Sequence, residues 1–191
     1  MLVSTNPATG EKAHEVESLD ADALRRTIDA AATAAETWCQ TSIVERAKVL
    51  YAVAKQLRAK KETIGALMTE EMGKPVKEAG PEVEKGAWCA EHYAEHAAEY
   101  LQDEVIASDA SESYVSYQPL GTILCIFPWN APVWVAMRGI VPALMAGNTV
   151  VMKHDPHVPA CAAALERAFR DAGAPAHILC NLPIPTELAE Q

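Results

Sequence analysis

The stretch from residue 119 to residue 159, PLGTILCIFPWNAPVWVAMRGIVPALMAGNTVVMKHDPHVP, constrains the fold more than any other part of the chain. Its segment 122–127 (TILCIF) is a short apolar run without useful alternation, bounded by Gly121 and Pro128. A run of this length and composition is typical of a strand that is covered on both faces. We therefore expect a buried strand here.

A helix and a second strand are expected directly after it. Residues 132–145 are too many and too rich in Ala, Leu and Met for a strand, and Gly147-Asn148 then supply the residues that usually end a helix. Residues 148–153 (NTVVMK) are β-branched at their centre and predict a second strand. Strand, crossover helix and strand form a right-handed parallel unit by default.

Two polar residues lie where such a unit binds ligands. Open α/β sheets bind ligands outside the carboxyl ends of their strands. Asn130 follows the first expected strand, and Lys153 ends the second. Both are therefore candidate site residues on position alone.

Composition excludes some partner classes. The chain has 191 residues and a formal net charge of -10 at pH 7, without a clustered Lys/Arg stripe, which argues against nucleic acid or an anionic membrane as a partner. Its five cysteines are widely spaced without a CxxC and lie mostly in apolar stretches, as small buried thiols in a reducing compartment do. The start MLVSTNPATG lacks the features of a signal peptide, and no apolar run is long enough to span a membrane, so we expect a cytoplasmic protein.

The region before the central stretch reads mainly as helices. Turn formers predict a small hairpin or extended segment over residues 1–18; after it, Asp20 is expected to cap one helix and Ser42 the next, with an interruption near Lys60-Lys61. The stripe of the first helix should comprise Leu24, Ile28, Ala31, Ala35 and Trp38.

A third helix is predicted over 82–101, starting at Pro81, and its His92 and His96 are four residues apart. Two such histidines could hold a metal, but there is no HExxH and the flanking glutamates favour a solvated helix face, so we assign no metal.

The remaining elements are shorter. Residues 113–118 (SYVSYQ) predict a half-exposed strand that needs a partner. A helix over 157–172 and a buried strand over 177–182 should follow the central unit.

These motifs resemble those of one family. The PWN at 128–130, the PALMAGNTVVMK run that ends at Lys153 and the preceding PLG are similar to the aldehyde dehydrogenase superfamily, over essentially the whole chain. RGIVPALMAGNTVVMKHDPHVP is most similar to the succinate-semialdehyde dehydrogenase branch, which has a Lys-His pair here instead of the commoner Lys-Pro. The resemblance implies NAD(P)-dependent oxidation of a small-molecule aldehyde, succinate semialdehyde above all, to its acid.

The resemblance assigns a catalytic role to Asn130. Aldehyde oxidation in this family begins with a cysteine thiolate attacking the carbonyl, and a rigidly held amide stabilises the resulting oxyanion. Asn130 matches the family's oxyanion asparagine, and Pro128 and Pro132 should stiffen its loop. The alternative is that Asn130 only caps the following helix.

The cofactor residues follow in the same way. Lys153 matches the lysine that binds the adenosine ribose, and Phe127, Pro128 and Trp129 match positions at the cofactor cleft; the alternatives are a solvent-exposed lysine and plain core aromatics. Pro156 replaces the acidic residue that usually grips the ribose 2′-hydroxyl, so NADP should be tolerated or preferred over NAD, although Asp155 leaves a negative charge nearby.

The resemblance also sets the fold class and the domains. It implies N-terminal helices over 1–108, an oligomerisation arm strand over 109–121 with SYVSYQ as the homo-oligomer contact, and an incomplete parallel Rossmann-like sheet over 122–191.

The family's nucleophilic cysteine and base glutamate have no match in this chain, so the catalytic domain is expected to be absent and the sequence to be an N-terminal, truncated portion. Two alternatives remain: a catalytically dead short form that binds a nucleotide or a partner subunit, and a short enzyme that uses one of the present cysteines.

Overall fold

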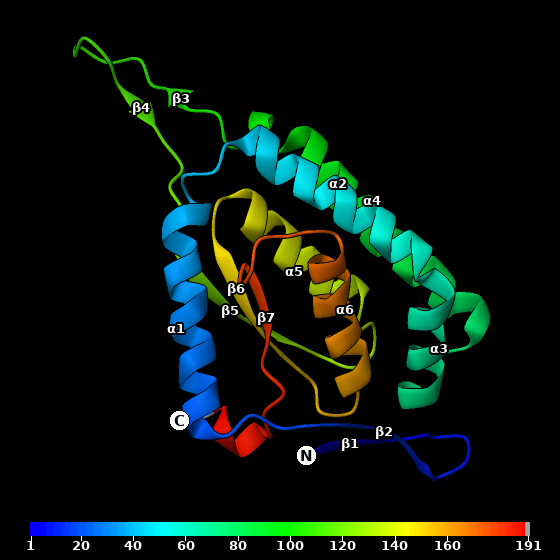
Figure 1. Cartoon of the computed structure of the whole chain (residues 1–191). Coiled ribbons are helices and arrows are strands. Elements are labelled where there is room, and N and C mark those ends of the chain that lie inside the picture. The colour runs from blue at the N-terminus through cyan, green and yellow to red at the C-terminus, as the bar shows by residue number, and fades with distance from the viewer. Residues whose placement is uncertain (190–191) are drawn as a thin grey trace.

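The computed structural model describes residues 1–189 and centres on a parallel three-stranded sheet. Its strands are β5 (Thr122–Phe127), β6 (Thr149–His154) and β7 (Leu179–Asn181), in the order β5-β6-β7. Helix α5 (Trp134–Met145) connects the first two strands, and α6 (Pro159–Asp171) connects the second and third (Figure 1). The expected parallel strand–helix–strand unit is confirmed.

Helices cover both faces of this sheet. Helix α1 (Ala21–Trp38) packs on one face, and α5 and α6 pack on the other (Figure 1). Outside α5 and α6 lies a further layer made of α2 (Ile43–Ala59), α3 (Lys61–Met72) and α4 (Val76–Tyr100). The main core lies between these helical layers and the sheet. No helix among residues 1–189 has the length and apolarity that crossing a membrane requires.

Two small antiparallel hairpins complete the chain. Strands β1 (Leu2–Thr5) and β2 (Lys12–Val16) form the predicted N-terminal hairpin, which packs near α3 and α6. Strands β3 (Glu104–Val105) and β4 (Tyr114–Val115) form an arm that projects from the body (Figure 1). The strand expected over 113–118 is thus only two residues long there, because nothing else in residues 1–189 pairs with it.

The helix ends follow local sequence signals. The Asp20 side chain accepts the N–H of Ala23, at 2.7 Å, and Ser42 accepts that of Glu45, as their predicted caps require. Gly73 ends α3 in the left-handed conformation, with φ 75°.

One helix start was predicted wrongly. Helix α4 begins at Val76, after Pro75, and Pro81 lies inside it rather than at its start. Proline in a helix interior forgoes one backbone hydrogen bond. The fully buried Ala79 and Val83 on either side keep this segment helical, because their packing in the core offsets that loss.

The expectation that β5 is covered on both faces was also wrong. Ile123, Cys125 and Phe127 point toward α5, but Leu124 is 56% exposed and Ile126 64% exposed on the α1 side. Helix α1 contacts that face near Thr149, whose hydroxyl donates to the Ala31 carbonyl, and does not extend over the end of β5. For the same reason Ile28, expected in the buried stripe, is 40% exposed.

The C-terminal part agrees with the expected order of elements. Helix α6 falls within the helix predicted over 157–172, and β7 is a shorter version of the strand expected over 177–182. A 3₁₀ turn, Thr186–Leu188, follows. Residues 190 and 191 lie outside the described residues.

Candidate functional site

The candidate site lies at the carboxyl end of β5 and β6. Phe127 ends β5 and is buried, whereas Pro128, Trp129 and Asn130 form an exposed loop directly after it. In the parallel register Phe127 lies opposite His154, the last residue of β6. The sheet therefore brings the Asn130 loop and Lys153 to one edge, as the sequence predicted for both.

Two side chains from other elements hold the far end of this loop. One Glu82 carboxylate oxygen accepts the backbone N–H groups of Val133 and Trp134, at 2.9 and 3.1 Å. The His154 ring lies 2.9 Å, Nε2 to oxygen, from the Pro132 carbonyl. The start of α5 is thus fixed by a buried carboxylate from α4 and by a buried imidazole from β6.

Asn130 does not cap α5 in this arrangement. Its side chain makes no hydrogen bond with any residue in the described range 1–189, and Glu82 accepts the N–H groups that a cap residue would bind. Asn130 is therefore exposed, and its side-chain amide has no hydrogen-bond partner within residues 1–189, at the tip of a loop that is anchored at both ends.

The near end of the loop is fixed by the Phe127 ring. This ring fills the space beside Gly139 of α5, where a Cβ would lie 2.9 Å from two ring carbons. Gly139 is therefore the residue that permits α5 to lie this close to the end of β5.

Lys153 points to the opposite, α1-facing side of the sheet. It is 6% exposed and lines a groove of about 320 Å³ with apolar side chains of α1, β5 and the segment after β7. The alternative of a solvent-exposed lysine at a strand end is wrong. The exposed Leu124 and Ile126 form the floor of the same groove.

Asp155 and Pro156 follow Lys153 in a turn. The Asp155 carboxylate accepts the His157 backbone N–H at 2.9 Å and lies 2.6 Å from the His157 ring nitrogen. Burial opposes ionisation of Asp155, but these hydrogen bonds outweigh it, so its pKa is lowered. The Asp155 carboxylate, whose charge the sequence placed near the site, is therefore already hydrogen-bonded to His157.

Cations surround the first turn of α5. The Lys85 ammonium lies 4.1 Å from the centre of the Trp134 ring, and the Arg138 guanidinium carbon lies 5.8 Å from it. Arg138 makes no ion pair with the described part of the chain. Arg138 lies on α5, which begins just after the Asn130 loop, and Lys85 reaches the same Trp134 ring from α4; both are exposed.

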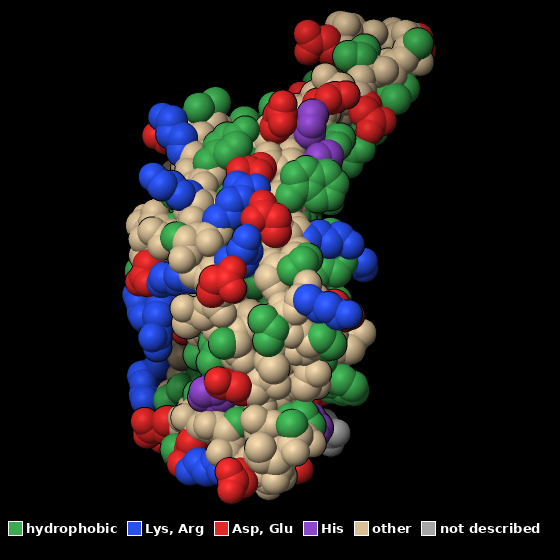
Figure 2. Space-filling view, turned by 90° about the vertical axis from the view of Figure 1, so that its right-hand side faces the viewer, with side chains coloured by type: hydrophobic (Ala, Val, Ile, Leu, Met, Phe, Trp, Pro, Cys, Tyr) green, Lys and Arg blue, Asp and Glu red, His purple; other side chains and the backbone are tan. Residues whose placement is uncertain are grey.

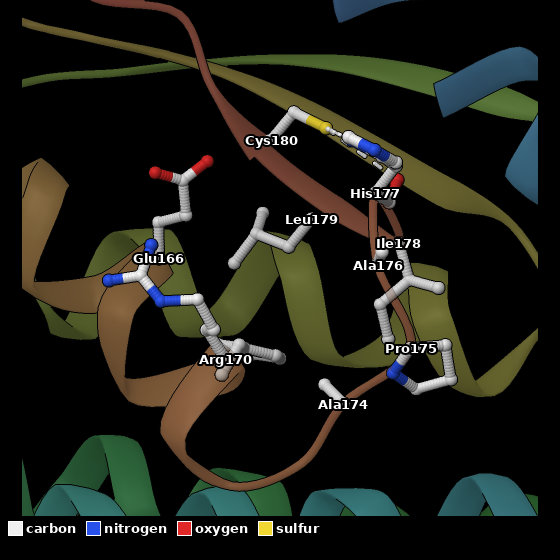
Figure 3. A pocket seen from close by; sticks show the side chains of 10 residues that line it. Glu166, Arg170, Ala174, Pro175, Ala176, His177, Ile178, Leu179 and Cys180 are labelled. Atoms are coloured by element: carbon white, nitrogen blue, oxygen red, sulfur yellow. Dashed lines mark hydrogen bonds between the residues drawn. The ribbon is translucent and has the colours of Figure 1, made fainter. Parts of the chain in front are cut away.

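A Cys–His contact occurs elsewhere, in a pocket between α6 and the segment before β7 (Figure 3). The Cys180 sulfur lies 3.8 Å from Nδ1 of His177. However, burial, with a smaller contribution from Glu166, raises the pKa of Cys180 to about 11. The thiol is therefore protonated near neutral pH, which is the opposite of what a nucleophile requires.

Three further thiols, two of them buried and Cys125 half-buried, have the same property. Burial raises the pKa of Cys89 to about 11 and also raises the pKa values of Cys125 and Cys161. None of these three has a histidine ring as a hydrogen-bond partner among residues 1–189.

Histidines and aromatic residues gather at the end of α4, where the arm leaves the body (Figure 2). His92 and His96 have ring centres 4.7 Å apart, and His92 Nε2 lies 3.1 Å from the Tyr100 hydroxyl. Over residues 1–189, no group of three or more His, Cys, Asp or Glu side chains is arranged to hold a metal.

Sequence reasoning missed Glu82 and His154 as parts of this site. A glutamate within a helix is ordinary and gives no local signal, and His154 stood out only as half of the Lys-His pair, which does not indicate what its ring contacts. Their contacts to residues 132–134 exist only after α4, β5 and β6 have packed together.

The fold and this edge define an α/β unit of the kind that binds a nucleotide-like cofactor across strand ends. Residues 2–190 match the sequence profile described as the aldehyde dehydrogenase family, and the chain belongs to that family.

Among its relatives, the succinate semialdehyde dehydrogenase [NAD(P)+] of Escherichia coli (strain K12) is 41% identical over 173 residues, covering 91% of this chain and 37% of that protein. The probable succinate-semialdehyde dehydrogenase [NADP(+)] of Synechocystis is 37% identical, over 100% of this chain and 42% of the relative.

Solved structures agree with this assignment. The succinic semialdehyde dehydrogenase of Streptococcus pyogenes, in complex with NADP+, superposes with a TM-score of 0.95 at 31% identity, covering 100% of this chain and 42% of that one. An NADP-dependent glyceraldehyde-3-phosphate dehydrogenase of Bacillus halodurans C-125, complexed with NADP, gives a TM-score of 0.90 at 33% identity, over 97% and 40% of the two chains. The chain thus spans about two fifths of the length of the proteins it matches.

Proposed function

We propose that this chain supplies the oxyanion amide and part of the nicotinamide-cofactor site of an enzyme that oxidises succinate semialdehyde to succinate. The observation that supports it best is the exposed Asn130, which follows β5 and has no side-chain hydrogen bond within residues 1–189, at the same carboxyl edge of the sheet as Lys153 near the end of β6. The names of the relatives favour this substrate.

Asn130 is suited to stabilise an oxyanion. A tetrahedral intermediate places negative charge on the former carbonyl oxygen, and an amide N–H that is already in position stabilises that charge with little reorganisation. The loop anchors at Phe127 and Pro132 restrict how far Asn130 can move. Loss of one such donor typically lowers the rate by roughly 10²–10³.

The residues around Lys153 suit an adenosine ribose that carries a 2′-phosphate. The cofactor, when bound, supplies the hydride acceptor, and this chain supplies the groove and the charge. Lys153 brings an ammonium into an otherwise apolar groove. Pro156 brings no carboxylate, and Asp155 is engaged by His157. NADP should therefore bind at least as well as NAD.

The substrate's distal carboxylate has a candidate partner in Arg138. This guanidinium is exposed, unpaired within residues 1–189, and close to Trp134 in the first turn of α5. Together with Lys85 it makes this side of the loop positive. A carboxylate that reaches past Asn130 would meet a favourable charge there.

The nucleophile and the base are proposed to come from a part of the protein that this sequence does not contain. Burial raises the pKa of four of its thiols, and a thiolate is the form that attacks an aldehyde. The chain on its own is accordingly proposed to bind cofactor without turning over substrate.

A homo-oligomer contact through the arm is part of the same proposal. The short β3–β4 ladder projects with Val105, Tyr114 and Val115 exposed by 86%, 57% and 45%. An exposed apolar strand pair of this kind is a template for pairing with another chain.

Calorimetric titration of the 191-residue chain with NADP+ and NAD+ tests the cofactor half of the proposal. We expect NADP+ to bind at least as tightly as NAD+. Its binding should weaken at least tenfold in Lys153→Met and stay unchanged in Lys55→Met, which replaces an exposed lysine of α2. Equal binding by both lysine variants, or turnover of succinate semialdehyde by this chain alone, would contradict it.

A further inference from the structure

His154 is a buried polar residue for which the proposed chemistry has no use. It ends β6, is 4% exposed, and its ring centre lies 5.9 Å from that of Phe127. A buried imidazole needs hydrogen-bond partners on both nitrogens. Those partners determine what the residue can do.

The partners of His154 fix its protonation state. The Pro132 carbonyl, 2.9 Å from Nε2, can only accept, so Nε2 must carry the proton. Nδ1 accepts the backbone N–H of Asp155, at 3.0 Å, and shares this donor with the Phe127 carbonyl, at 2.9 Å, so Nδ1 is unprotonated. Burial lowers the pKa of His154 in spite of the Pro132 hydrogen bond and the nearby Asp155 charge, so the neutral ring is the stable form.

The hydrogen bond to Pro132 is the side-chain anchor nearest to Asn130 along the chain. Pro128, Trp129 and Asn130 make no hydrogen bonds of their own to the part of the chain that the structure describes. Glu82 holds the next two amides, 133 and 134, and therefore fixes α5 rather than the loop tip. Without the His154 contact, the segment from 128 to 132 would keep one hydrogen bond, from the Val135 N–H to the Ala131 carbonyl at 3.0 Å, and no side chain from outside α5 would hold it by a hydrogen bond.

We propose that His154 is a positioning residue, which holds the Pro132 carbonyl and thereby fixes the orientation in which the loop presents the Asn130 amide. The inference rests on the proposed oxyanion role of Asn130 for its functional meaning. It concerns the geometry of the loop, which can be measured without substrate or cofactor.

The test compares loop order in three variants of the 191-residue chain by ¹⁵N relaxation. His154→Leu removes the donor and keeps an apolar side chain in place, His154→Gln can restore an N–H near Nε2, and His157→Gln alters an exposed histidine of the same turn. In His154→Leu the order parameters of Trp129 and of the Asn130 backbone and side-chain amides should fall from about 0.85 to below about 0.6. They should stay high in the other two variants, and those of α5 and α6 should stay high in all.

A merely structural role predicts a different pattern. His154→Leu would then lower the midpoint of unfolding while the Asn130 amide keeps wild-type order, and that result would overturn the proposal. So would a mobile Asn130 in the wild type.

A measurement on the wild type alone covers the case in which His154→Leu does not fold. Imidazole ¹⁵N shifts should identify the Nε2–H tautomer, with a coupling across the hydrogen bond to the Pro132 carbonyl carbon; an Nδ1–H tautomer would refute the inference. Failure of NADP+ binding with the loop pattern intact would remove the proposed function and leave this inference standing.

Discussion

Replacing Glu82 tests how the site is anchored. Glu82 is 8% exposed, and its carboxylate accepts the N–H groups of Val133 and Trp134 at the start of α5. It also forms an ion pair with Lys74, whose side chain is 14% exposed. Glu82→Gln keeps an oxygen acceptor but removes the charge. Hydrogen bonds to a charged group contribute about 1.5–3 kcal/mol, against about 0.5–1.5 kcal/mol for neutral ones. Two weakened bonds therefore lower the free energy of unfolding by about 2 kcal/mol.

The ion pair adds to this loss. Breaking a buried pair by removing one partner costs about 3–5 kcal/mol, and the partial exposure of Lys74 reduces that figure. We therefore expect Glu82→Gln to cost roughly 2–4 kcal/mol in urea denaturation of this chain, with an unchanged m-value.

Glu84→Gln is the matched control for this prediction. Glu84 lies on the same helix and pairs with Arg58, but its side chain is 45% exposed, so its loss should cost no more than about 1 kcal/mol. Equal effects of the two substitutions, or a cost below about 0.5 kcal/mol for Glu82→Gln, would refute the reasoning.

Three further outcomes follow from the same packing. Because burial lowers the pKa of His154, the unfolded chain takes up this proton first as the pH falls below about 6.5, so stability falls with pH there. Between pH 6.5 and 5, the free energy of unfolding from urea titrations should fall more steeply for the wild type than for His154→Gln, by up to about 1.4 kcal/mol per pH unit; parallel profiles would contradict this. Gly139→Ala should cost about 1–3 kcal/mol in thermal unfolding, because its methyl group meets the Phe127 ring, and wild-type stability of this variant would contradict the close packing of α5 on β5. The Cys161 thiol is fully buried with a raised pKa, so it should react with a disulfide reagent at pH 7 only on unfolding, and rapid reaction in the native chain would count against the packing of α6.

Local signals in the sequence predicted much of the fold. The caps at Asp20 and Ser42 and the left-handed Gly73 bind backbone groups within a few residues, so short motifs suffice to locate them. The parallel unit was predictable because apolar runs of the right lengths alternate with one helix-forming segment.

Exposure and long-range contacts were not predictable in the same way. The apolar run of β5 indicated two covered faces, but composition does not reveal whether this chain contains the covering element, and Leu124 and Ile126 are exposed. Likewise the sequence predicted a helix start at Pro81. Whether a proline can instead lie inside a helix depends on how well its neighbours are buried, and burial was not visible in the sequence.

The candidate site shows the same division. Asn130 and Lys153 were located from strand ends and from family motifs, and their places at one edge of the sheet agree with that prediction. Their catalytic and cofactor roles stay predictions. Glu82 was not predicted, because its contact with the start of α5 spans 51 residues of sequence and depends on packing between α4 and α5.

The measurement that tests the central claim most directly is a map of NADP+ binding on the 191-residue chain by amide chemical shifts. The account predicts shifts concentrated at residues 127–130 and 153–156, at the carboxyl edge of β5 and β6, with little change in the Cys180–His177 pocket between α6 and β7. Shifts centred on that pocket, or no saturable shifts from a folded chain, would contradict it.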